Sequence, residues 1–114
     1  MKRTADLLVV DILENISLIE KSIESVKKKD FLLSPDLRDA TLRRLEVIGE
    51  AVKNMPVSFK EKYSQIPWKR IAGFRDIVIH TYFRIDTDII WNVIKKDIPP
   101  LKQKIIKIKG DLDE

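Results

Sequence analysis

The fold is decided first by the stretch LLVVDILENISLIEKSIESV, which spans residues 7–26. Its apolar side chains recur every three or four positions and form one stripe: Leu8, Ile12, Ile16, Ile19, Ile23 and Val26. Glutamates and lysines lie mostly off that stripe, which is the pattern of an amphipathic helix with one face on a core. The sequence predicts a helix from about Arg3 to about Lys28.

A start signal for a second helix follows at Ser34, Pro35 and Asp36. A serine hydroxyl suits the N-cap, proline is tolerated at the first helical position, and an acid in the first turn complements the helix dipole. Apolar residues continue at helical spacing as far as Met55, and Pro56 ends the run. The sequence therefore predicts a second helix that begins at Pro35 and stops before Pro56.

The middle of the chain is less regular. Residues 56–67 form its least periodic stretch, which predicts one short turn of helix over residues 58–63 and then a loop. Ile66-Pro67-Trp68 leads into a third apolar run, Ile71-Ala72-Gly73-Phe74, that continues to Phe83. This run predicts a short buried helix.

A last helix is predicted to open at Asp86-Thr87-Asp88, where a cap residue stands beside acids of the first turn. Its apolar positions extend to Ile108. Pro99 and Pro100 are expected to kink or split this helix, because proline lacks the N–H that an interior helical position donates. Residues 110–114 are expected to form a frayed end.

Period-two alternation, the mark of a half-buried strand, is nowhere sustained along the chain. The predicted fold class is therefore all-α. We expect an antiparallel bundle of four to five helices with short connections, forming a single helical domain over residues 1–114.

The composition argues against several classes of site. The chain has 114 residues, no cysteine and one histidine, so a thiolate nucleophile, a disulfide framework and an iron–sulfur cluster are excluded, and a histidine-rich metal site is not favoured. We expect no metal and no cofactor. The apolar run at residues 7–10 is too short for a signal peptide or a membrane span, so a cytoplasmic chain without membrane association is expected. The net charge of +4 favours an anionic partner.

The single histidine, His80, is the default candidate for acid–base chemistry, since an unperturbed imidazole titrates at about pH 6.5. On a helix Asp76 lies one turn earlier on nearly the same face, where its carboxylate would hydrogen-bond the imidazole and fix its tautomer. Arg75 offers a permanent charge and a planar fork suited to phosphate. Arg75 and Tyr82 share a face within roughly 20°, but Arg75 and His80 lie about 140° apart. Arg75 must therefore use its length, or precede the regular helix, to meet a shared substrate.

Structural interpretations of the same residues stay open. A lone histidine in a bundle is often an ordinary polar side chain, and Arg75 and Asp76 would pair at a helix start. Tyr82 would be a core aromatic with its hydroxyl at the rim. The favoured interpretation of Trp68 and Trp91 is that they are packing anchors. The favoured interpretation of the basic runs is that they are solvated helix faces: Lys27 to Lys29, Lys102, Lys104, Lys107 and Lys109.

The string Arg75-x-x-x-x-His80-x-Tyr82 stands in a specific context. It follows LEVIGEA at residues 45–51, overlaps IPWKRIAGFRD at residues 66–76 and precedes Trp91. Over nearly its whole length the chain resembles the HepT-like toxins of the HEPN (higher eukaryotes and prokaryotes nucleotide-binding) superfamily.

The resemblance implies a metal-independent endoribonuclease that acts as the toxin of a type VII-like two-component module. In that family the motif arginine and histidine, here Arg75 and His80, form the active site, and a homodimer brings two copies together. The residue after the arginine is usually Asn or Asp, here Asp76. A minimal nucleotidyltransferase antitoxin, MntA, inactivates the toxin and attaches AMP to the tyrosine, here Tyr82.

Two other functions remain open. A non-catalytic helical module would use the same motif to hold a nucleotide or to dock a nucleotidyltransferase, and it would leave RNA intact. A purely structural dimer would use its apolar helix faces for assembly alone. Cut RNA with 2′,3′-cyclic ends distinguishes the nuclease from both.

Overall fold

A computed structural model describes residues 4–84 and 87–113, with only the backbone described for residues 80–84. Within these ranges every regular element is helical, so the predicted all-α class is confirmed. The elements are α1 (Ala5–Ile23), α2 (Lys28–Leu32), α3 (Pro35–Lys53), α4 (Val57–Lys62), α5 (Trp68–Ala72), α6 (Phe74–Arg84), α7 (Thr87–Asn92), the π-helix η1 (Val93–Asp97) and α8 (Ile98–Leu112).

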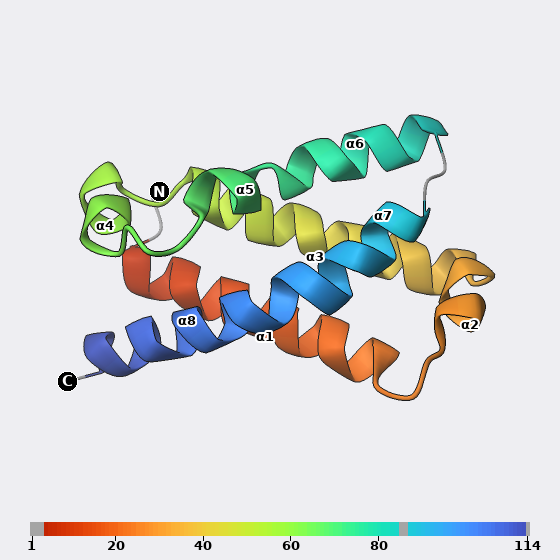
Figure 1. The fold of residues 1–114 in the computed structure, drawn as a ribbon. Coiled ribbons are helices and arrows are strands. Elements are labelled where there is room, and N and C mark those ends of the chain that lie inside the picture. Colours follow the sequence, from red (N-terminus) through yellow and green to blue (C-terminus); the bar gives the residue numbers. More distant parts are fainter. Residues whose placement is uncertain (1–3, 85–86, 114) are drawn as a thin grey trace.

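The long segments form an antiparallel bundle, as predicted. In Figure 1, α1, α3, α6 and the run from α7 to α8 each travel in the direction opposite to the one before. Helix α3 packs against α1 on one side and against α6 on the other, and α8 packs against α1. Helix α6 therefore lies at one side of the bundle and packs on α3.

The core is built from the apolar stripes of these helices. The predicted stripe of α1 is buried from Leu8 to Ile23, whereas Val26 is only partly buried because the helix has already ended. Helices α3 and α8 contribute matching stripes at three- and four-residue spacing: Leu42, Leu45, Ile48 and Val52, and Ile98, Leu101, Ile105 and Ile108. No helix within the described ranges is both long and apolar enough to cross a bilayer.

The predicted extension of the first helix to Lys28 is wrong, since α1 ends at Ile23. The Val26 N–H donates to the Ile23 carbonyl at 3.0 Å and closes a turn. The chain then forms α2, which buries Phe31 completely with its ring centroid 5.2 Å from that of Trp91. Burial of an aromatic ring against a distant residue outweighs the local apolar period here.

The second helix agrees with its prediction. The Ser34 hydroxyl accepts a hydrogen bond from the Leu37 N–H at 3.2 Å, and Pro35 is the first residue of α3. The helix ends at Lys53, slightly before the expected Met55. The short turn expected over residues 58–63 is α4, which covers residues 57–62.

The single buried helix predicted from Ile71 to Phe83 is wrong, because the chain forms two helices that meet at Gly73. The Gly73 N–H still donates to the Lys69 carbonyl at 3.1 Å, and a Cβ placed on Gly73 would lie 3.1 Å from the Arg70 carbonyl oxygen. A glycine therefore suits this junction between α5 and α6. Helix α6 is also not buried throughout, since Arg75, Asp76 and Ile79 are exposed.

The predicted interruption at Pro99 and Pro100 is confirmed and takes the form of a π turn. The Ile98 N–H bonds to the carbonyl of Val93, five residues earlier, directly before the two prolines. Neither proline has an N–H to donate, so the α-type hydrogen bonds from positions 99 and 100 to the preceding turn are missing. The chain nevertheless stays helical from α7 to α8.

The C-terminal end differs from its prediction. Residues 110–112 belong to α8 rather than to a frayed tail, and the Lys109 ammonium pairs with the Asp113 carboxylate at 2.8 Å. A lysine and an acid four residues apart face each other on a helix and support its last turn. The predicted cap residue Asp86 and the tail residue Glu114 lie outside the described residues.

Candidate functional site

Arg75, the motif arginine, lies on the second position of α6 and is paired with an acid of α3. Its Nη1 lies 2.7 Å from Oε1 of Glu50. The Arg75 side chain is 45% exposed, so part of the guanidinium is bound to the protein and part faces solvent. A permanently charged, partly anchored fork on the surface is suited to binding a phosphate.

Gly49 lets α3 approach the start of α6 closely. A Cβ at Gly49 would lie 3.3 Å from the backbone nitrogen of Arg75 and 3.4 Å from the carbonyl oxygen of Ala72. Both neighbours are backbone atoms of the α5–α6 junction, which cannot move aside as a flexible side chain does. Glycine at this position therefore allows the close approach of the two helices that carry Glu50 and Arg75.

Sequence reasoning assigned no role to Glu50. Gly49 beside it was a signal, because a glycine in a helix interior costs about 1 kcal/mol relative to alanine. The partner of Glu50 is Arg75, which lies on another helix. Only the packing of α3 against α6 reveals this pair.

The other three predicted site residues share α6 with Arg75. Asp76 is exposed in the first turn of the helix. The backbone of α6 continues through His80 and Tyr82, but their side chains lie outside the described part of the structure. The predicted contact between Asp76 and His80 thus stays a prediction, while the alternative that Arg75 precedes the regular helix is wrong.

The tryptophans are packing anchors, in agreement with the favoured interpretation. Trp68 is buried, and its Nε1–H donates to the carbonyls of Lys60 and Tyr63, each at 3.1 Å. Trp91 packs on Phe31 and carries the Lys95 ammonium 4.9 Å from its ring centroid. These packing contacts account for both rings without a role in base stacking.

Several lysines of the basic runs are engaged with nearby acids or carbonyls at the surface. The ion pairs and hydrogen bonds are Lys28 with Asp88, Lys102 with Glu20, Lys109 with Asp113, and Lys104 with the Gln65 carbonyl. These contacts support the interpretation of the lysines as solvated helix faces.

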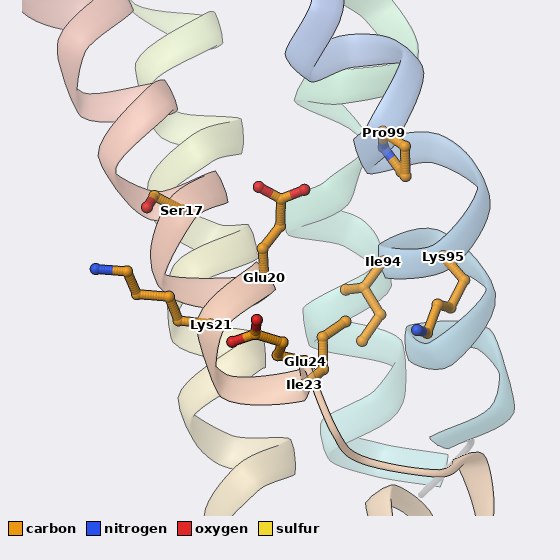
Figure 2. Close-up of a pocket in the computed structure, with 8 residues that line it drawn as sticks. All are labelled: Ser17, Glu20, Lys21, Ile23, Glu24, Ile94, Lys95 and Pro99. Atoms are coloured by element: carbon orange, nitrogen blue, oxygen red, sulfur yellow. The ribbon is translucent and has the colours of Figure 1, made fainter.

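A groove between α1 and the η1–α8 segment lies away from the motif arginine. Its volume is about 470 Å³, and none of its lining residues belongs to α3 or α6. Figure 2 shows Glu20 extending from α1 toward the facing segment, whereas Lys21 points away from it. Glu20 is already paired with Lys102 at 2.8 Å.

Among the described side chains, no group of three histidines or acids is arranged to hold a metal ion.

Comparison with known protein families gives a match over most of the chain. The family model described as "Ribonuclease HepT-like" matches residues 12–108, a range that includes Arg75, His80 and Tyr82. The chain belongs to the HepT-like ribonuclease family. The resemblance stated from the sequence is thereby confirmed, and α6 is the helix of this family member that carries the motif.

Two curated relatives extend the comparison. A Methanocaldococcus jannaschii protein named "Gamma-glutamylcyclotransferase and putative RNase" is 47% identical over 114 residues, which is 100% of this chain and 51% of that protein. This chain thus spans about half the length of that relative. A Thermococcus cleftensis protein named "Probable ribonuclease HepT" is 42% identical over 109 residues, which is 96% of this chain and 99% of that protein. No solved structure gives a significant match.

Proposed function

We propose that this chain is a metal-independent endoribonuclease and the toxin of a two-component toxin–antitoxin module. The observation that carries the proposal is the family match over residues 12–108, within which α6 presents Arg75 as a partly exposed, partly anchored cation. The relatives' names point to the same chemistry. RNA is an anionic substrate, and a chain of net charge +4 suits it.

The proposed reaction uses the nucleophile that RNA itself carries. His80 takes the proton of a 2′-hydroxyl, the 2′-oxygen attacks the adjacent phosphorus, and the bond to the 5′-oxygen breaks. The leaving 5′-oxygen takes a proton from an acid, which gives a 2′,3′-cyclic phosphate and a 5′-hydroxyl. Arg75 neutralises the charge that builds on the phosphate oxygens. Asp76 is proposed to hold the imidazole in one tautomer.

A homodimer is proposed because cleavage calls for a base and an acid, whereas each chain has one histidine. A twofold assembly places two copies of the same residue at one cleft. Ile79, 47% exposed on the helix that carries Arg75, is an apolar side chain that such an assembly would cover. We place the reaction in the cytoplasm, where RNA is available.

The test is cleavage of total RNA in excess EDTA by the adduct-free wild-type chain, with Arg75→Ala beside it. We expect wild type to produce fragments ending in 2′,3′-cyclic phosphates, and Arg75→Ala to lose about 10²-fold or more of the rate because a phosphate contact in the transition state is removed. Equal cleavage by both chains would contradict the assignment of Arg75. Intact RNA in both, with nucleotide binding retained, would favour the non-catalytic binding module.

Tyr82 is proposed as the site at which a cognate MntA-like nucleotidyltransferase attaches AMP. The phenolic oxygen attacks the α-phosphorus of ATP, pyrophosphate leaves, and the hydroxyl proton is released. On a regular helix Tyr82 would share a face with Arg75 within roughly 20°, and we propose that the added phosphodiester competes for the guanidinium that the substrate needs.

We expect the wild-type chain, incubated with that enzyme and ATP, to gain the mass of one or more AMP units and to lose RNA cleavage. Intact mass spectrometry of wild type and of Tyr82→Phe is the measurement. The phenylalanine variant should stay unmodified and active. An adduct of equal yield on both chains would place the modification elsewhere.

A further inference from the structure

We propose that Glu50 is a positioning residue that holds the guanidinium of Arg75 in the orientation needed for the phosphate. This inference rests on the proposed function and assigns a role to a residue outside the Arg75-to-Tyr82 motif. It joins a specific acid on α3 to the arginine on α6, two helices that pack directly against each other.

The contact is a close ion pair with one side screened from water. Glu50 Oε1 lies 2.7 Å from Arg75 Nη1, and this oxygen is inaccessible to solvent although the Glu50 side chain as a whole is 39% exposed. Oε1 has no aligned hydrogen bond, so charge attraction is what holds the two groups together. A carboxylate oxygen out of contact with water needs its cation, so the Arg75 fork is held at that nitrogen.

Stability alone does not account for this pair. Both side chains are more than a third exposed, and ion pairs of that kind contribute little to folding. The ion pair involves one nitrogen of the guanidinium, Nη1, and aligns none of its N–H groups on Glu50 Oε1, so donors remain for an incoming phosphate. Orientation before binding is what such a contact supplies, because a preoriented group loses less freedom when the transition state forms.

The backbone beneath the pair is equally constrained. Gly49, the residue before Glu50, faces the Arg75 backbone nitrogen so closely that a Cβ would lie 3.3 Å from it. The two charged side chains therefore start from backbone positions that are fixed relative to each other. By contrast, Arg38 with Asp39 and Arg43 with Glu46 are pairs within α3 alone.

Glu50→Gln removes the charge and keeps the size of the side chain. We expect the single-turnover cleavage rate in EDTA to fall about tenfold to a hundredfold, since a misplaced catalytic group costs rate. RNA binding at low salt should be unchanged or tighter, because one negative charge near the phosphate site is gone. A loss of rate without a loss of binding separates positioning from a general weakening of the fold.

Glu46→Gln is the matched control. Glu46 lies one turn earlier on α3, its side chain is 38% exposed against 39% for Glu50, and it pairs with Arg43 at 3.8 Å. This variant should cut RNA at the wild-type rate. A rate for Glu50→Gln equal to that of Glu46→Gln would overturn the proposal, and a faster rate would show instead that Glu50 withholds Arg75 from the substrate.

A second measurement keeps this inference separate from the nuclease assignment. Nitrogen-15 NMR of the Arg75 guanidinium reports whether its rotation is hindered, whatever the chain does to RNA. We expect hindered rotation in wild type and in Glu46→Gln, and free rotation in Glu50→Gln. If wild type leaves RNA intact, the proposed function fails while this signature still supports the pairing. Free rotation in wild type would overturn the positioning role.

Discussion

His80→Ala is expected to abolish RNA cleavage in EDTA, with a loss of about 10² to 10⁴ in rate or more, while the fold and the dimer stay intact. Removing a general base or acid costs a rate of this order. The chain has one histidine, so no other imidazole can take over the proton transfer. The measurement is the single-turnover cleavage rate, with helical circular dichroism and sedimentation as checks on fold and assembly.

Chemical rescue provides the control for this variant. Free imidazole should restore part of the lost rate in His80→Ala, because that variant lacks an imidazole. It should leave the rate of Arg75→Ala unchanged, because that variant lacks a guanidinium instead. EDTA-resistant cleavage by His80→Ala at the wild-type rate would refute the assignment. A loss of helicity together with the loss of activity would show that His80 supports the fold instead.

The parts of the fold that local signals determine were predicted well. Ser34 and Pro35 start α3 because a hydroxyl cap and a proline at the first position act within one turn. Pro99 and Pro100 located the interruption before α8 because a missing N–H is a local property. Neither feature depends on what packs against the helix.

The parts that distant contacts determine were not predicted. The end of α1 at Ile23 and the separate helix α2 depend on burial of Phe31 against Trp91, a residue far along the chain. The break at Gly73 had a glycine as its signal, yet the apolar run on both sides suggested one continuous helix. Periodicity reports which face is apolar and does not report where a helix must turn to cover its neighbour.

The candidate site divides in the same way. Arg75, Asp76, His80 and Tyr82 stand in one short string, so their shared helix was predictable from spacing. Glu50 was not, because it meets Arg75 only through the packing of α3 on α6. The local string carries the groups that we propose to react, and the tertiary contact between α3 and α6 is proposed to orient one of them.

Gly49→Leu is the second change with a large expected effect, because it acts on stability and on the site together. The position faces the Arg75 nitrogen and the Ala72 carbonyl oxygen, where even a Cβ would lie 3.3 and 3.4 Å away. A leucine side chain must push α3 away from the α5–α6 junction. Overpacking of this kind costs about 1–3 kcal/mol, and a rigid backbone neighbour favours the upper end. Cleavage should fall as well, since Glu50 and Arg75 would separate.

Gly110→Leu is the matched control, since it makes the same substitution in a helix where nothing lies within 4 Å of the added Cβ. Leucine has a higher helix propensity than glycine, so the free energy of unfolding of this variant should equal that of wild type or be slightly higher. The variant should also retain activity. Urea unfolding of both variants gives the free energy of unfolding, and the RNA assay gives the rate. If Gly49→Leu matched Gly110→Leu in both measurements, the close approach of α3 to α6 would not be what fixes Arg75. A stable Gly49→Leu chain with a lower cleavage rate would show that helix spacing acts on the arginine directly.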